Sequence, residues 1–365
     1  MDSRKSFLTR LTTLLLFSIL LVYVLIMAKQ ILYPIVLALL FSYFIFPLVD
    51  FFETKFKFPR LLAILFSFLI FGGLLFFVVN LVVIQIKNFS DDLPALKEQA
   101  VRNLATLQYF IAEKFGINQA EQNLWFKEKV FSLFDSGNET LTHIFLKASL
   151  TIEALVFIPI FSFFMLIYRE RAKTFILMLV ESQNGELTEN LLQQISKVTI
   201  KYVSGVMIVV SILGISHAIA LSIIGVKYAI VLGLLAASLS IIPYFGTAVS
   251  MLIPILFAAV TQGNPYVLLF IGLYFWAIII IDHNILTPTI VGGNVSLNPF
   301  ITILGIIIAG TIWQIPGMIV IVPVLAVIKI VCDNVEKLKP WGYILGTDPH
   351  ILFFDKIKGM IQKKK

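Results

Sequence analysis

The chain has 365 residues, of which 59% are hydrophobic and 13% are charged. Soluble domains are about 45–50% apolar and about 25% charged, so this composition excludes an ordinary soluble globular protein. It predicts an all-α protein that crosses a lipid bilayer several times. The net charge of +7 does not indicate a nucleic-acid partner, because the basic residues lie beside apolar segments and in the C-terminal tail.

The residue types that carry most enzyme chemistry are few and scattered. A single cysteine, Cys332, excludes an internal disulfide and a cysteine-based metal site, and the four histidines have no metal-ligand spacing. The sequence has no phosphate-binding glycine loop and no His-Glu-x-x-His or Gly-x-Ser-x-Gly motif. We therefore expect no enzyme activity, no cofactor and no bound metal.

Three apolar runs open the chain and predict an N-terminal membrane region over residues 1–86. The runs cover residues 11–27, 31–49 and 61–86. At about 1.5 Å per residue, each approaches the hydrocarbon thickness of about 30 Å. The first run has the basic-then-apolar look of a signal peptide, but no small-residue cleavage site follows it.

Residues 87–147 differ abruptly in composition, with mixed charges and apolar positions at three- and four-residue steps. That spacing predicts two or three amphipathic helices outside the membrane, with breaks near Gly116 and residues 136–138. A packed subdomain and a partner-binding cap are both compatible with the pattern.

The next region, 148–202, holds a predicted fourth span (149–168) and a cytoplasmic amphipathic segment, before a fifth span at 203–224. Short basic loops at the N-terminus, at 55–60 and at 169–173 then fall on one side of the membrane. The positive-inside rule makes that side the cytoplasm. Both termini, including the basic tail 336–365, are predicted to be cytoplasmic, with the insert on the opposite side.

Two apolar blocks, 229–260 and 300–331, are interrupted near their centres. The predicted tips consist of Pro243, Tyr244, Phe245 and Gly246 in the first block, and Gln314, Pro316 and Gly317 in the second. Each arm is shorter than the ~20 residues of a full span. Matching proline- and glycine-interrupted segments point to a transporter binding site. We expect two re-entrant hairpins in an inverted repeat within a transport core at 203–335, with about eight membrane segments in all; pairs of short spans are the alternative.

The stretch from Asp282 to Pro299 is the least membrane-like part of the C-terminal half. Irregular backbone at membrane depth is tolerated only where protein buries it or where it lines a cavity. Asp282 is either a functional carboxylate or a helix cap. His217 lies in mid-span and is either a structural hydrogen-bonding group or a pathway residue. The candidate solute or ion pathway residues are Asp282, His283, Asn284, Thr287, Pro288, Asn294, Asn298, Pro299 and His217.

Several short motifs carry a resemblance to a known family: Ile242–Gly246, Asn284–Pro288, Leu297–Pro299, Pro316–Met318 and Val322-Pro323. Together they resemble the autoinducer-2 exporter family of bacterial membrane permeases. The resemblance implies an inner-membrane homo-oligomer, a pentamer being one candidate, that exports a small polar signal or exchanges cations for protons. The family pattern has a glutamate-bearing stretch where Asp282-His283 stands here, so either Asp282 replaces it or the ion coupling differs.

Three functions therefore stand as hypotheses. The first is a secondary transporter that exports a small polar solute, such as an autoinducer-2-like quorum-sensing signal. The second is a Na⁺(Li⁺)/H⁺ antiporter of the same fold that uses Asp282 as its carrier. The third is a non-transporting scaffold in the lipid bilayer that binds a partner through residues 87–147.

Overall fold

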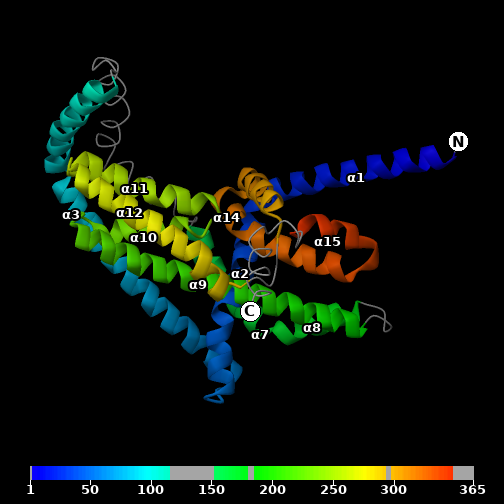
Figure 1. Ribbon diagram of the computed structural model, residues 1–365. Helices are drawn as coiled ribbons and strands as arrows, with labels where there is room; N and C mark the ends of the chain where they lie inside the picture. The colour runs from blue at the N-terminus through cyan, green and yellow to red at the C-terminus, as the bar shows by residue number, and fades with distance from the viewer. Residues whose placement is uncertain (1, 116–151, 180–184, 293–296, 348–365) are drawn as a thin grey trace, which may run out of the picture. The chain divides into compact units, whose positions relative to one another are not determined.

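The computed structural model describes the chain except for residues 1, 116–151, 180–184, 293–296 and 348–365 (Figure 1). Over the described ranges the protein is almost entirely helical, and its β-structure is limited to one isolated bridge between Leu297 and Gly346. This confirms the predicted all-α class. The chain divides into two compact units, which are described separately below. The first unit comprises residues 1–55, 156–204 and 293–365, and the second comprises 56–155 and 205–292.

Apolar helices of membrane-spanning length dominate the structure. Five helical segments of the described chain are long and apolar enough to cross a bilayer: Lys29–Thr54, Arg60–Phe89, Gly185–Ile224, Pro265–Ile290 and Pro299–Asn334. Four shorter apolar helices accompany them, at Leu15–Met27, Val156–Ile167, Ala229–Leu239 and Phe245–Thr261. These lengths support a multi-pass membrane protein. The total of about eight membrane segments stays a prediction.

The first unit contains α1 (Asp2–Met27), α2 (Lys29–Thr54), most of α7 (Ile152–Ile167), α8 (Arg169–Met178), the first half of α9 (Gly185–Ile224), α14 (Pro299–Asn334), a short 3₁₀ turn (Glu336–Leu338) and α15 (Lys339–Leu345). Helices α2 and α7 meet at small residues. The hydroxyl of Ser162 donates to the carbonyl oxygen of Ala38 at 2.8 Å, and Ser42 donates to the same oxygen at 2.7 Å. Small residues let helices approach closely, and their hydroxyls bond across the contact.

Helix α14 is folded back on itself at Gln314, whose backbone is non-helical (φ 56°, ψ −137°). Gly305 packs against Ile321 and Leu325, and Gly310 packs against Met318. Gly305 and Ile321 would be about 24 Å apart along a straight helix, so the two arms form an antiparallel hairpin. The indole of Trp313, beside the tip, donates to the carbonyl of Leu25 at 2.9 Å.

The tip of this second hairpin differs slightly from the prediction. Gln314 makes the turn, whereas Pro316 and Gly317 already belong to the second arm. Proline fits there because the first turn of a helix does not use its N–H groups. Gly317 is required because a Cβ atom at this position would overlap the carbonyl oxygen of Ala309.

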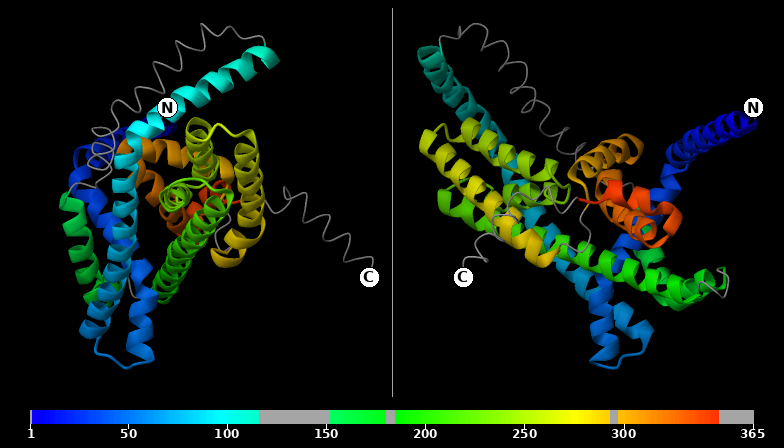
Figure 2. Two further views of the ribbon diagram at one scale, coloured as in Figure 1. Left: turned by 90° about the vertical axis from the view of Figure 1, so that its left-hand side faces the viewer. Right: turned by 45° about the vertical axis from the view of Figure 1, so that its right-hand side comes forward.

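The second unit contains α3 (Arg60–Phe115), the second half of α9, α10 (Ala229–Leu239), α11 (Phe245–Thr261), α12 (Pro265–Ile281), a π-helical turn η3 (Asp282–Leu286) and α13 (Thr287–Ile290). Figure 2 shows α10, α11 and α12 beside the second half of α9. Their core is built from apolar side chains of all four helices, including Leu221, Leu232, Ala258, Ile271 and Phe275.

Helices α10 and α11 form the first hairpin, at the predicted place. The tip is strained: Tyr244 has φ 66° and ψ −47°, and the N–H of Phe245 donates to the carbonyl of Pro243 at 2.8 Å. This is the rare form of the γ-turn, which is costly for a residue with a side chain. Phe245 and Gly246 are the first residues of α11, and a Cβ atom at Gly246 would overlap the carbonyl of Leu239.

Helix continuity departs from the sequence-based expectation in three places. The predicted boundary between the N-terminal spans and the insert, at residues 86/87, is not a helix end, because α3 continues to Phe115. The predicted boundary before the fifth span, at residues 202/203, lies inside α9. The segment from Asp282 is helical up to Ile290 rather than irregular. A composition change marks a change of surroundings and does not by itself break a helix; α3 even continues through Pro94. The predicted breaks within 116–138 lie outside the described residues.

Candidate functional site

The site lies next to Pro288, a proline that the helix accommodates without ending. Pro288 has no N–H and crowds the carbonyl of the preceding turn, so a proline here is expected to kink or end the helix. Instead the helix widens into the π-turn η3, in which the N–H of Thr287 donates to the carbonyl of Asp282, five residues earlier. Single π-turns inside α-helices are frequent at functional sites, because the widening re-aims side chains and frees backbone groups.

The widened turn brings two polar side chains together. The hydroxyl of Thr287 donates to Oδ1 of Asp282 at 2.7 Å. Residues five apart lie about 140° apart around a regular α-helix, so this bond depends on the π-turn. Asp282 is only 6% exposed, and no described lysine, arginine or histidine forms an ion pair with it. Within the described residues, the carboxylate is thus buried with a hydroxyl as its hydrogen-bond donor and without a charged partner.

Apolar side chains flank Asp282 along its helix. Ile278 and Leu286, one turn before and after it, pack against Val209 and Leu213 of α9. A charged carboxylate in such surroundings is costly unless a proton, a metal cation or a charged partner neutralises it. The described part of the chain has no group of three or more acidic, histidine or cysteine side chains that could hold a metal ion tightly.

A second polar cluster lies on the neighbouring part of the same helices. His217 of α9 is 2% exposed, and its Nδ1 lies 2.8 Å from the hydroxyl oxygen of Tyr274 on α12. That hydroxyl also lies 2.9 Å from Oγ of Ser216, and the ring of Phe275 stacks on the imidazole at 4.7 Å between centroids. Close helix packing supports the cluster, since a Cβ atom on Gly233 of α10 would lie 2.6 Å from the N atom of Ala218.

Tyr274 and Ser216 are site residues that sequence reasoning missed. Their signal was weak: a tyrosine in an apolar helix is usually read as an interfacial anchor, and a serine in a small-residue run as a packing residue. Only the packing of α9 against α12 reveals Tyr274 as the partner of His217.

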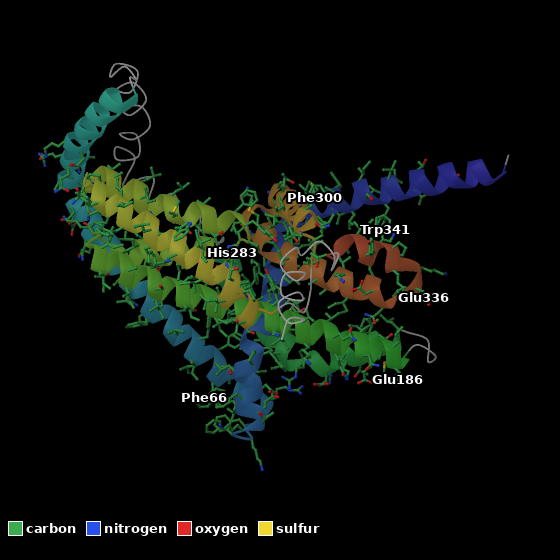
Figure 3. The ribbon with its side chains drawn as sticks, in the orientation of Figure 1. Phe66, Glu186, His283, Phe300, Glu336 and Trp341 are labelled. Atoms are coloured by element: carbon green, nitrogen blue, oxygen red, sulfur yellow. The ribbon has the colours of Figure 1, made fainter. Side chains whose placement is uncertain are left out.

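The other predicted pathway residues are less buried than Asp282 and His217, and Thr287 itself is exposed. His283, labelled in Figure 3, is exposed, and so are Asn284 and Pro288. The amide of Asn284 donates to the carbonyl of Ile280 at 2.8 Å within its own helix. Their roles in transport stay predictions.

Three further predicted residues lie at the start of α14, or just before it. Oδ1 of Asn298 accepts from the N–H of Phe300 at 3.0 Å, so Asn298 is the N-cap and Pro299 the first residue of α14. Asn294 lies outside the described residues. The structure therefore brings together Asp282 with Thr287, and His217 with Ser216 and Tyr274. It assigns Asn298 and Pro299 to the other unit.

The fold and these clusters define a class: a multi-pass helical membrane protein with ionisable groups buried among apolar helices, which is characteristic of membrane transporters. The comparison with known families is more specific. The model of the AI-2E family transporters matches residues 14–337, so the chain belongs to this family and has a role in membrane transport. This confirms the resemblance to the autoinducer-2 exporters.

A curated relative points the same way over a shorter stretch. A protein of Borreliella burgdorferi (strain ATCC 35210 / DSM 4680 / CIP 102532 / B31), described as "Putative transport protein", is 29% identical over 83 residues. The match covers 23% of this chain and 23% of the relative.

Proposed function

We propose that the protein is a secondary transporter that exports a small polar solute, and that Asp282 and Thr287 bind its coupling cation. The observation that carries the proposal is the buried Asp282 carboxylate, which has a hydroxyl donor and forms no ion pair with any lysine, arginine or histidine that the structure describes. Leaving a carboxylate charged in such a place costs on the order of several kcal/mol. A bound H⁺ or Na⁺ removes that cost, so occupancy of the site changes which helix arrangement is stable.

The proposed cargo is a hydroxylated solute of the autoinducer-2 type, the kind of signal used in quorum sensing. Family membership supports a solute of this kind. The strained hairpin tips support a role in solute contact, because residues such as Tyr244 and Gln314 adopt positive φ at a cost of about 1–3 kcal/mol each. Strain of that kind persists mainly at functional sites.

The first hairpin is proposed to be re-entrant, meaning that it enters and leaves the bilayer on the same side. Its first arm, α10, has 11 residues, and a helix of that size is about 16 Å long. This is about half of the hydrocarbon thickness. The tip around Tyr244 would then lie at membrane depth, where polar backbone requires a protected, hydrated surrounding.

The test is efflux from proteoliposomes loaded with a small panel: a furanone-type signal, a polyol, Na⁺ and Li⁺. We expect the parent protein to release the furanone-type signal faster than protein-free vesicles, and Asp282→Asn to abolish the response to a cation gradient. Asp91→Asn is the matched control, because Asp91 is an exposed carboxylate on α3. A parent protein that moves none of the four, or an Asp282→Asn variant that responds like the parent, would refute the proposal.

Na⁺(Li⁺)/H⁺ antiport is the second candidate, and the same carboxylate favours it. A single buried carboxylate that binds either H⁺ or Na⁺ is sufficient for exchange, without any organic cargo. Addition of NaCl or LiCl to acid-loaded proteoliposomes would collapse the pH gradient if this candidate is right, and would leave it intact if cation binding requires the organic solute. We do not propose a scaffold without transport, because the chain belongs to a transporter family.

We further propose a bacterial inner-membrane location, cytoplasmic termini and a homo-oligomer such as a pentamer. The basic residues beside the predicted spans support this orientation. Thiol labelling of the single Cys332 is not suitable for testing it, because Cys332 is buried. In intact cells, cysteines introduced in the N-terminal segment or the tail should react with a membrane-impermeant thiol reagent only after the membrane is permeabilised. Light scattering of the purified protein would count the subunits.

A further inference from the structure

Helix α3 presents one continuous stripe of residues to the ends of α10 and α11. The stripe follows steps of three and four residues, so its members lie on one face of the helix. Its members are Gln85, Phe89, Asp92, Leu96, Ala100 and Asn103. Leu96 and Ala100, in the middle of the stripe, are 1% and 0% exposed. Figure 1 shows this part of α3 beside the ends of the hairpin.

The first foot of the hairpin, where α10 begins, is held by the N-terminal part of the stripe. The hydroxyl of Tyr228 donates to Oδ2 of Asp92 at 2.6 Å, and its ring stands edge-on to Phe89 at 5.2 Å between centroids. Oε1 of Gln85 accepts from the N–H of Val231 at 3.2 Å. That N–H is among the first groups of α10, which have no acceptor within the helix. Gln85 therefore caps α10 from a different helix.

The second foot, where α11 ends, is held by the C-terminal part of the stripe. Nδ2 of Asn103 donates to the carbonyl of Val260 at 3.0 Å, which satisfies one of the last carbonyls of α11. Gly263 follows with φ 61°, and a Cβ atom there would lie 2.6 Å from Cγ of Asn103. The two feet are also tied to each other, because the side-chain amide of Gln262 donates to the carbonyl of Gly225 at 2.8 Å.

We propose that Gln85, Asp92 and Asn103 are positioning residues that fasten both feet of the α10–α11 hairpin to α3, so that the hairpin and this part of α3 move as one rigid piece during transport. A foot that swung away would break the hydrogen bonds of Val231 N–H and of the Val260 carbonyl and would also expose the buried Leu96 and Ala100. The inference rests on the proposed transport function. It implies that the movement of the transport cycle occurs elsewhere, and that any displacement of the α3 extension displaces the hairpin.

A reversible cross-link tests the rigidity. In a Cys332→Ala background, the changes Asn103→Cys and Gly263→Cys place two thiols at the second foot. A Cβ atom on Gly263 lies 2.9 Å from Cβ of Asn103, and a shift of about 1 Å gives disulfide geometry. We expect transport with the bond formed to be within twofold of transport by the Cys332→Ala protein, because the bond replaces the hydrogen bond that Asn103 supplied. Loss of transport on oxidation, with recovery on reduction, would overturn the inference. Asn103→Cys alone, treated with the same oxidant, is the control.

A distance measurement tests the same point without depending on transport. Spin labels at Glu98 on α3 and Leu256 on α11 both sit on exposed positions. We expect one narrow distance distribution that is the same without ligand and with Na⁺ or the furanone-type signal. Gln85→Leu with Asn103→Leu should broaden it, whereas Asn88→Leu, an exposed amide outside the stripe, should not. A ligand-dependent shift in the parent protein would refute rigidity, whereas a rigid but transport-inactive protein would refute the proposed function instead.

Discussion

The hydroxyl of Thr287 offers the most quantitative test of the cation site. Thr287→Val keeps the size and branching of the side chain but removes the donor that lies 2.7 Å from Oδ1 of Asp282. Hydrogen bonds to a charged group contribute about 1.5–3 kcal/mol. Since about 1.4 kcal/mol is a factor of ten in affinity, the half-saturating cation concentration should rise about 10- to 100-fold. Thr287→Ser, which restores the hydroxyl, should remain close to the parent.

The assay is the Na⁺ dependence of transport in proteoliposomes at fixed pH, with vesicle-incorporated protein quantified for each variant. Thr289→Val is the matched control, because Thr289 is an exposed threonine of the same short helix. A monodisperse elution profile shows that each variant is folded. If Thr287→Val has the half-saturation of the parent, the hydroxyl does not belong to the cation site. If Thr287→Ser fails as badly as Thr287→Val, the effect comes from packing.

Three further predictions follow from the packing and the charges. Gly246→Ala should lower the free energy of unfolding in detergent by about 1–3 kcal/mol, because its Cβ atom overlaps the last carbonyl of α10. Gly272→Ala, whose Cβ atom meets nothing within 4 Å, should raise it by up to about 1 kcal/mol. Equal effects of the two changes would contradict the close packing at the hairpin tip. Tyr274→Phe removes a hydroxyl shared by two side chains of α9 and should cost about 1–3 kcal/mol; an unchanged melting temperature would contradict the cluster. Lys173 lowers the pKa of Glu189 and Glu189 raises the pKa of Lys173, through a 2.7 Å hydrogen bond. The stabilisation by this pair is therefore present near neutral pH, and it is lost as acid protonates Glu189 or as base deprotonates Lys173. Melting curves of Glu189→Gln should converge with the parent at both extremes, and a difference that persists in acid would contradict the pairing.

Hydropathy predicted the class and the interruptions of the two apolar blocks, because a bilayer imposes limits on the length and polarity of each span that can be read from one sequence. Both interrupted blocks are hairpins, with strained tips at Tyr244 and Gln314. Their re-entrant insertion stays a proposal. The exact turn residue of the second hairpin was not predictable, since Pro316 signals a helix start as readily as a break.

The site was harder to predict than the hairpins. Asp282 could be singled out as a carboxylate in an apolar helix, but its partner Thr287 could not, because a five-residue step brings side chains together only in a π-turn. That turn depends on how the helix accommodates Pro288, and from the sequence alone a proline at this position predicts a break in the helix. The contact between His217 and Tyr274 depends on the packing of two helices that are distant in the sequence.

The central claim is that the buried carboxylate of Asp282 couples a cation to solute movement. The most direct test compares the accumulation of the solute against its own gradient, driven by an imposed gradient of H⁺ or Na⁺, with simple downhill flow in the same vesicles. The account predicts that Asp282→Asn loses the driven accumulation while Asp91→Asn retains it. Accumulation by Asp282→Asn to the level of the parent protein would contradict the account.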